Sequence, residues 1–267
     1  MLSDAQLREY HDDGFVVVPE VLTSRDLARI RDEVERLYGA DHPGRVLEKD
    51  GRTIRGVHGC HQTSELFSRL VRLPDLLESA EQLLASKVYV HQSKVNAKRA
   101  LRGDVWPWHQ DYIFWEREDG MPAPLVTNVA LLLDDATPYN GPLLFVPGSH
   151  RMGTLSTERR RAAGGEESWK SNLAADLDYA LTAEQLAALV ARLGMRAATG
   201  AAGSMVLFDP RLVHGSGTNM SPYDRQLLII TYNSVDNVPQ QVPSRRPEFL
   251  SASDTTPLAP LTGGLRP

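Results

Sequence analysis

The sequence has little of several features that would place a chain in a special class. It contains one cysteine, Cys60, in 267 residues, which excludes an internal disulfide and fits a reducing cytoplasm. It also has no excess of positive charge, because 29 Lys and Arg residues stand against 34 Asp and Glu residues. The net charge of −5 argues against a nucleic-acid partner, which would require a basic footprint.

Long hydrophobic runs are absent as well. Apolar stretches such as VALLLDD and LLIITY are far too short to span a bilayer. No basic amphipathic segment indicates a membrane surface as a partner, and the acidic, helical start MLSDAQLREYHDDG does not read as a signal peptide. The apolar share of 42% and the charged share of 24% are ordinary for a globular enzyme. We therefore expect a cytoplasmic protein.

Helical patterns dominate residues 1–86, which we expect to form a supporting layer. A capping-box start and Gly14 bound a first short helix, and the buried strand FVVV follows it. A longer helix begins at about Ser24, with apolar residues at helical spacing. A further helical stretch covers roughly 64–84 and should break or kink at Pro74.

The apolar period changes from about 3.6 to 2 over residues 87–239. Short apolar segments separated by Gly, Pro, Asn and Asp are typical of an antiparallel barrel or jelly roll. An insertion at about 154–195, with a capped helix at 182–194, is a candidate lid. Residues 240–267 should be extended or partly disordered. We predict one domain over 1–267, mainly β with flanking helices, around a double-stranded β-helix (cupin-like jelly-roll) core.

The stretch WPWHQDYIFW, from Trp106 to Trp115, sets His109 and Asp111 two residues apart. On one strand these side chains would share a face and offer two metal ligands. His214 is the third candidate, since it ends a strand and glycines follow it. Two histidines and a carboxylate form the facial triad of non-haem Fe(II) oxygenases. A zinc hydrolase can use the same ligands, and such pairs are often ordinary polar residues, so both alternatives stay open here.

Arg225, eleven residues beyond His214, favours the oxygenase alternative. Arginine holds a carboxylate in a bidentate fork, and Arg225 shares a strand face with Leu227 and Ile229, whose apolar surroundings would strengthen that contact. A co-substrate such as 2-oxoglutarate chelates iron at one end and must be anchored at the other. The alternative for Arg225 taken alone is a surface salt bridge.

Several segments together resemble the phytanoyl-CoA dioxygenase family of Fe(II)/2-oxoglutarate oxygenases. They are YHDDGFVVVPEVLT, WHQD, NGPLLFVPGSHRMG and VHGSGTNMSPYDRQLLIITYN. Within the family the chain looks most like bacterial hydroxylases of small zwitterions, namely those of ectoine and of free leucine. The resemblance implies Fe(II) as cofactor, with 2-oxoglutarate and O2 as co-substrates.

The resemblance also implies residue roles. His109, Asp111 and His214 would hold iron, and Arg225 would bind the distal carboxylate of 2-oxoglutarate. Further candidate contacts to 2-oxoglutarate are Gln92, Asn96, Asn128, Ser216 and, more weakly, Lys94. For Gln92 and Asn96 the alternative is the satisfaction of neighbouring backbone groups.

Candidate substrate contacts come from two segments and one aromatic residue. Asp178 and Tyr179, with Asp176, lie in the predicted lid and could meet an ammonium group. Arg55 and His58, with His61, lie near RTIRGVHGCH and could meet a carboxylate, and Trp115 could form an apolar wall. Solvated lid carboxylates and a plain core tryptophan are the alternatives.

The sequence thus predicts a dioxygenase that hydroxylates an unactivated C–H bond of a free small amino acid, leucine-like first, in natural-product biosynthesis. Succinate and CO2 would be the by-products. Ectoine, another small zwitterion or a natural-product intermediate is the second substrate hypothesis. A non-redox metal-binding jelly roll or a zinc hydrolase is the alternative of a different class. We expect a small-molecule partner and a monomer or homodimer.

Overall fold

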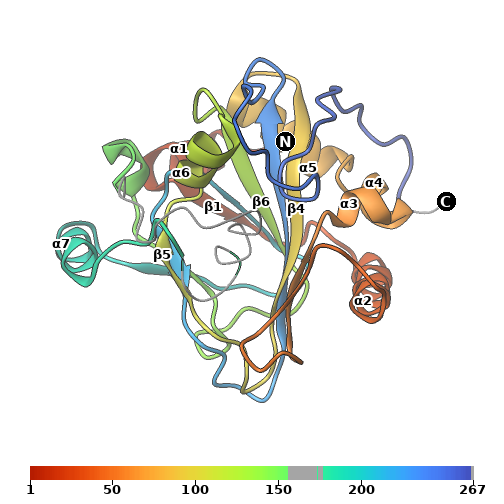
Figure 1. The fold of residues 1–267 in the computed structure, drawn as a ribbon, viewed down its shortest axis with the longest axis horizontal. Helices are drawn as coiled ribbons and strands as arrows, with labels where there is room; N and C mark the ends of the chain where they lie inside the picture. Colours follow the sequence, from red (N-terminus) through yellow and green to blue (C-terminus); the bar gives the residue numbers. More distant parts are fainter. Residues whose placement is uncertain (156–172, 174–176, 266–267) are drawn as a thin grey trace.

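The structure is a computed structural model that describes residues 1–155, 173 and 177–265. Two antiparallel sheets face each other (Figure 1). The larger sheet has the order β1-β9-β6-β11-β4-β3-β2 and the smaller sheet the order β5-β10-β7-β8. Their bounds are β1 Phe15–Val18, β2 Arg45–Leu47, β3 Ile54–His58, β4 Val88–Lys98, β5 Trp106–His109, β6 Val126–Leu132, β7 Leu143–Phe145, β8 Arg196–Ala198, β9 Met205–Phe208, β10 His214–Ser216 and β11 Arg225–Ser234. The predicted fold class, mainly β with flanking helices and a jelly-roll core, is confirmed.

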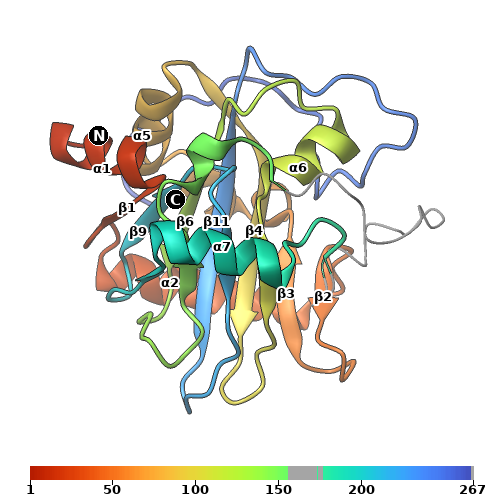
Figure 2. The ribbon, with the colours of Figure 1, turned by 90° about the vertical axis from the view of Figure 1, so that its left-hand side faces the viewer.

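Helices cover the outer faces of the two sheets. In Figure 1, α2, α3 and α4 lie on one side of the large sheet, and α7 lies on the other side, beyond β5. Figure 2 shows the strands of the large sheet side by side behind α7. The helix bounds are α1 Asp4–Asp13, α2 Ser24–Gly39, α3 Cys60–Thr63, α4 Glu65–Leu70, α5 Pro74–Leu84, α6 Tyr112–Phe114 and α7 Ala183–Leu193, with a π-helix η1 at Trp115–Asp119 and a 3-10 helix η2 at Ser149–Met152.

The local signals for helix ends act as predicted. Ser3 and Gln6 form a reciprocal capping box at α1, and Gly14 ends that helix in the left-handed conformation at φ 86°. Pro74 occupies the first turn of α5, where its missing N–H costs nothing. Thr182 caps α7 in a second capping box. These ends follow from contacts within a few residues, which is why the sequence predicts them.

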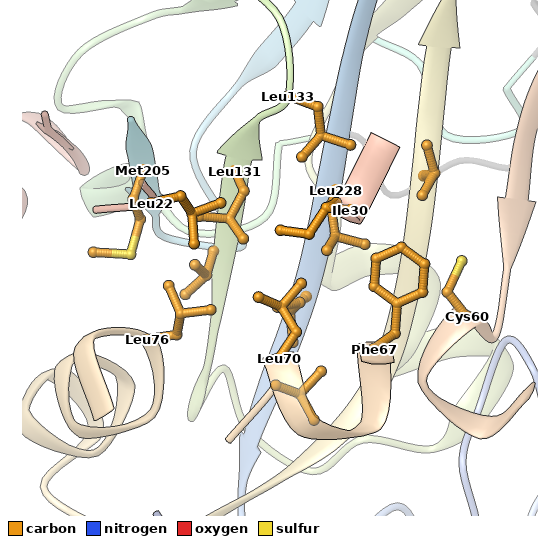
Figure 3. Packing of buried hydrophobic residues seen from close by; sticks show 14 of the residues in the cluster. Leu22, Ile30, Cys60, Phe67, Leu70, Leu76, Leu131, Leu133, Met205 and Leu228 are labelled. Atoms are coloured by element: carbon orange, nitrogen blue, oxygen red, sulfur yellow. The ribbon is translucent and has the colours of Figure 1, made fainter. Parts of the chain in front are cut away.

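The main core lies between the large sheet and the helices that cover it. Figure 3 shows Phe67, Leu70 and Leu76 from the helices against Leu131 and Leu228 from β6 and β11. All five side chains are at most 1% exposed. Truncating one such leucine to alanine costs about 2–5 kcal/mol, so this layer holds the sheet that carries the site.

Two outer segments of the chain join the large sheet in ways that the sequence did not indicate. Residues 1–86 are not only helical, because β2 and β3 pair with each other and β3 extends the large sheet beside β4. β2 and β3 are too short for the alternation of apolar and polar residues to be recognised in the sequence. The tail from 240 to 265 is extended, as expected, but it returns to the sheet: Leu250 is fully buried, and Ala252 N–H donates to the carbonyl of His91 at 3.0 Å.

Among the described residues, no helix combines the length and the apolar character needed to cross a membrane.

Candidate metal and co-substrate site

His109, Asp111 and His214 come together between the two sheets. His109 ends β5, His214 begins β10, and the two residues are direct partners across the antiparallel pair. One potential ligand atom from each of the three residues lies within 4.8 Å of the others. His109 Nε2 is 3.4 Å from Asp111 Oδ1, and His214 Nε2 is 3.7 Å from Asp111 Oδ2.

The expected route by which Asp111 reaches this cluster is wrong. β5 stops at His109, and Asp111 has helical angles, φ −69° and ψ −37°, at the start of α6. The N–H of the next residue, Tyr112, donates to the carbonyl of Pro210 at 3.0 Å and fixes this turn. Trp115 therefore begins η1 rather than continuing a strand. A single tight turn, not a shared strand face, brings the carboxylate beside the imidazole.

Neighbouring groups orient each member of the triad. Nδ1 of His109 donates to the carbonyl of Pro107 at 2.6 Å, and Nδ1 of His214 donates to that of Leu212 at 2.9 Å. A carbonyl can only accept, so both Nδ1 atoms carry the proton and both Nε2 lone pairs point to the centre. Outer-shell contacts of this kind hold metal ligands in place.

Asn128 supports the carboxylate of Asp111. Its amide nitrogen donates to Asp111 Oδ2 at 2.8 Å, and its amide oxygen accepts from Thr231 Oγ1 at 2.7 Å. Asn128 is not among the residues that line the cavity, and its contact with 2-oxoglutarate stays a prediction.

The electrostatics suit metal binding near neutral pH. Burial, together with the neighbouring His109, lowers the pKa of His214 to about 4, so this imidazole is neutral. Burial alone would raise the pKa of Asp111, but the neighbouring His214 and His109 outweigh it and hold the pKa well below its usual range. An ionised carboxylate and imidazole lone pairs converge without competing protons. This donor set fits a divalent first-row metal with open positions, as Fe(II) oxygenases require.

Arg225 supplies a buried positive charge without a counter-ion. Its residue is 1% exposed, one Nη donates to the carbonyl of Gly141, and its Nε has no hydrogen-bond partner. No carboxylate of the described residues lies within salt-bridge distance, and burial lowers the pKa of the guanidinium to about 9. An unpaired buried charge is costly, so this position fits a ligand that brings its own carboxylate. 2-Oxoglutarate is such a ligand.

One cavity joins the triad to Arg225. Of the residues predicted to contact 2-oxoglutarate, its walls include Gln92, Lys94, Asn96 and Ser216. The Asn96 Oδ1 and Ser216 Oγ atoms are buried without a hydrogen-bond partner, whereas Gln92 Nε2 donates to the carbonyl of Leu250 at 3.1 Å. The alternative role considered above was hydrogen bonding to neighbouring backbone groups. It applies in part to Gln92, but not to Asn96 Oδ1.

Of the predicted substrate residues, Trp115 and His58 line the cavity and the others do not. Arg55 is the clearest correction: it forms a salt bridge with Glu48 at 2.9 Å, donates to two backbone carbonyls and stacks 3.8 Å from the Trp106 ring centroid. All three guanidinium nitrogens of Arg55 already have partners, and the side chain does not line the cavity.

Asp178, Tyr179 and His61 do not line the cavity. Asp178 and Tyr179 are buried, and the Tyr179 ring packs edge-on against Phe114 with centroids 5.1 Å apart. His61 Nδ1 is engaged with Ser93 Oγ at 2.7 Å. Asp176 lies outside the described residues.

Sequence reasoning missed Arg246. It belongs to the tail, in a segment whose Pro and Ser content gives no periodic signal, yet its side chain is 9% exposed and lines the cavity. Leu173 and Leu177, from the segment predicted as a lid, also contribute to the wall. The pair of adjacent arginines in PSRRPEF is the signal that could have drawn attention to this position.

Comparison with known proteins agrees with this geometry. The family model described as phytanoyl-CoA dioxygenase (PhyH) matches residues 10–227. The chain is 42% identical to the L-proline trans-4-hydroxylase of Streptomyces griseoviridis, over 97% of this chain and 96% of the relative. It is 36% identical to the ectoine dioxygenase of Halomonas elongata, over 94% of this chain and 76% of the relative.

Solved structures give the same result. The crystal structure of EctD from S. alaskensis with 2-oxoglutarate and 5-hydroxyectoine superimposes with a TM-score of 0.85 at 30% identity, over 99% of this chain and 89% of that chain. A second EctD structure, with bound Fe, gives a TM-score of 0.83.

Fold and site together define a 2-oxoglutarate-dependent non-haem iron dioxygenase. The chain belongs to the phytanoyl-CoA dioxygenase family. This assignment replaces the zinc-hydrolase and metal-binding-protein alternatives, and the triad with the unpaired Arg225 fits Fe(II) and 2-oxoglutarate, the cofactor and co-substrate predicted from the sequence.

Proposed function

We propose that this enzyme hydroxylates an aliphatic carbon of a small free amino acid. The observation that carries the proposal is a second set of nitrogen groups in the cavity, separate from Arg225. It consists of His58, Lys94 and Arg246. A substrate carboxylate would have a binding partner there that 2-oxoglutarate does not occupy.

The strand register orders the two ends of the cavity. On β4, Asn96 is the partner of Leu227 on β11, two residues from Arg225. Lys94 is the partner of Ile229, and Gln92 that of Thr231, which holds Asn128 behind the triad.

2-Oxoglutarate would therefore extend from Arg225 past Asn96 to the metal. Lys94 and Gln92 lie farther along, on the side left for the substrate. For both residues we therefore propose contact with the substrate in place of the contact with 2-oxoglutarate expected from the sequence.

The charges at this far end fit a carboxylate. His58 is the partner of Lys94 across the β3–β4 pair, and burial lowers its pKa well below the usual range, so it is neutral. Lys94 forms no salt bridge with a described residue, and burial lowers the pKa of its ammonium. Arg246 uses its Nε and one Nη for Asp119, and its other Nη lies 3.6 Å from Glu118 Oε2. Of its five N–H groups, those not directed at Asp119 remain for a ligand.

The opposite walls fit a compact apolar body. Trp106, Phe114, Trp115, Leu173 and Leu177 line the same cavity. An apolar pocket with a few fixed polar groups is the usual form of a small-molecule site. A free amino acid with an aliphatic side chain combines the carboxylate and the apolar body that these walls require.

The chemistry divides between the metal centre and the chain. When Fe(II) and 2-oxoglutarate are bound, the centre activates O2 for the hydroxylation of an unactivated C–H bond, with succinate and CO2 as by-products. Arg225 and Asn96 would orient the co-substrate, Lys94 and Arg246 would hold the substrate carboxylate, and the aromatic wall would exclude water. Placing one C–H bond against the centre is the protein's contribution to rate and selectivity.

The relatives refine the order of candidate substrates. L-Proline now comes first, because the 42% identical relative is an L-proline trans-4-hydroxylase. Leucine, expected first from the sequence, comes second, and ectoine third. All three carry a carboxylate on a small, largely apolar body. A role in natural-product biosynthesis remains a prediction.

An amino-acid panel tests the proposal. The purified chain, loaded anaerobically with Fe(II), is given 2-oxoglutarate and O2 with L-proline, L-leucine, L-pipecolate or ectoine, and products are read by mass spectrometry. We expect at least one amino acid to gain one oxygen atom with an equal amount of succinate. D111A, which lacks the carboxylate of the triad, is the control without turnover. Succinate formation that no member of the panel stimulates would count against the proposal.

A further inference from the structure

A buried chain of charged groups holds Arg246 at the cavity wall. Arg246 Nε donates to Asp119 Oδ1 at 2.7 Å, and one Nη donates to Asp119 Oδ2 at 2.5 Å. His91 Nε2 lies 3.0 Å from the same Oδ2. The three residues come from the tail, from η1 and from β4, so the carboxylate joins three separate segments. The side chains of His91 and Asp119 are both fully buried.

Asp119 acts in this chain as an ionised acceptor. Burial alone would raise its pKa, but the charge of Arg246 and the hydrogen bonds from His91 and Arg246 bring the pKa to about 2. An ionised carboxylate only accepts, so His91 Nε2 carries the hydrogen that it donates. A bidentate carboxylate fixes the plane of the guanidinium as well as its position. Arg246 thus presents one defined edge to the cavity.

His91 joins the tail to the sheet in two ways. Its carbonyl accepts from the N–H of Ala252 at 3.0 Å, and its ring reaches Arg246 through Asp119. The ring also meets Trp115, a cavity-wall residue, edge-on with centroids 5.8 Å apart. His91, which helps to orient Arg246 through Asp119, therefore also contacts the apolar wall of the cavity.

We propose that Asp119 and His91 are positioning residues for substrate selection. Neither lines the path between Arg225 and the triad; they act through Arg246, whose long side chain would otherwise sample many rotamers. Holding it in one rotamer lowers the entropy cost of binding a carboxylate and fixes which carbon faces the metal. The inference rests on the proposed function, since Arg246 is assigned there to the substrate carboxylate.

D119N is the first test, because it keeps the shape of the side chain and removes the charge. We expect the KM for the amino acid to rise about 10- to 100-fold, the loss typical of a hydrogen bond to a charged group. The KM for 2-oxoglutarate should change less than about twofold, and the yield of hydroxylated product per succinate should fall. A merely structural role would lower the melting temperature and affect both KM values together.

A double-mutant cycle with R246M separates positioning from direct contact. If Asp119 acts only through Arg246, D119N in the R246M background has no further effect on the amino-acid KM. Additive effects would overturn the proposal, as would a D119N enzyme with unchanged amino-acid KM and product yield.

The His91 variants keep the test usable if D119N does not fold. H91Q retains an N–H that can reach Asp119, whereas H91L does not. We expect H91L to raise the amino-acid KM about three- to tenfold and H91Q to restore most of the loss. Equal effects of H91Q and H91L would count against the role of His91 in orienting Arg246 through Asp119.

R36Q, which removes the exposed partner of the ion pair with Glu33 and lies away from the cavity lining, is the control expected to behave as wild type. Wild-type inactivity against the whole panel would overturn the proposed function and this role with it. Wild-type turnover with unaffected D119N and H91L variants would overturn this role alone.

Discussion

Replacing Arg225 by methionine tests whether its buried charge serves ligand binding or the stability of the fold. Without a ligand, the Arg225 guanidinium is buried, has no salt bridge among the described residues and leaves Nε without a partner. Methionine keeps a flexible stem of similar length and removes the charge. We expect the free energy of unfolding of R225M to stay within about 1 kcal/mol of wild type, because relief of the unpaired charge offsets the lost bond to Gly141.

The same change should remove the response to 2-oxoglutarate. At about 100 times its Kd a ligand stabilises the folded state by about 2.7 kcal/mol, which in a chain of this size raises the melting temperature by about 5 °C. Losing a buried charge-assisted contact of about 3 kcal/mol weakens binding about 150-fold. At the same concentration the shift for R225M would then fall below about 1 °C.

R55M is the matched control, because Arg55 is equally buried but paired. Its removal leaves Glu48, whose side chain is 8% exposed, as an uncompensated buried carboxylate. We expect a loss of about 3–5 kcal/mol and a melting temperature about 6–10 °C lower. Thermal unfolding is measured for wild type, R225M and R55M under anaerobic Fe(II), with and without 2-oxoglutarate. It gives the stability of each protein and the shift in melting temperature that 2-oxoglutarate causes. The reasoning fails if R225M is destabilised as much as R55M, or if it keeps the wild-type shift with 2-oxoglutarate.

Three further changes probe other parts of the site. N128A removes the donor that orients Asp111, so Fe(II) affinity measured by anaerobic titration should fall about 10- to 100-fold, and an unchanged affinity would refute the supporting role. K94Q should raise the KM for the amino acid about tenfold and leave that for 2-oxoglutarate nearly unchanged, which steady-state kinetics with each varied in turn would show. Burial lowers the pKa of His61 from 6.5 to about 4, so the folded protein holds this imidazole neutral. As the pH falls below about 6.5, the unfolded chain takes up the proton before the folded chain does. The folded state therefore loses stability between about pH 6.5 and pH 4. Urea unfolding at pH 7 and pH 4.5 should show that H61Q loses about 2–3 kcal/mol less than wild type over this range, and equal losses would contradict the assignment.

Some sequence predictions survive even when their structural premise fails. His109 and Asp111 lie together with His214, as expected, although Asp111 sits in a helical turn rather than on the strand. A separation of two residues keeps two side chains close in either backbone conformation. The pair therefore indicated metal chemistry more reliably than it indicated secondary structure.

Predictions about individual charged residues depended on contacts that no local pattern contains. Arg55 and Arg225 are both 1% exposed arginines on strands of the large sheet. Arg55 meets Glu48 through the β2–β3 hairpin, whereas Arg225 meets no carboxylate of the described residues. Residue type was the same in both cases, and only the partners brought in by the fold distinguish a structural ion pair from a ligand anchor.

The sequence by itself determined the helix ends, the jelly-roll class, the candidate metal ligands and the family. These depend on caps, periodicity and short motifs, whose energies come from residues a few positions apart. Only the tertiary structure decided that Asn128 supports Asp111, that Lys94 lies farther from Arg225 along the strand pair than Asn96 does, and that Arg246 reaches the cavity from the tail. Arg246 and Asp119 are 127 positions apart, and which distant charges meet is set by strand order and by the cost of burying a charge alone.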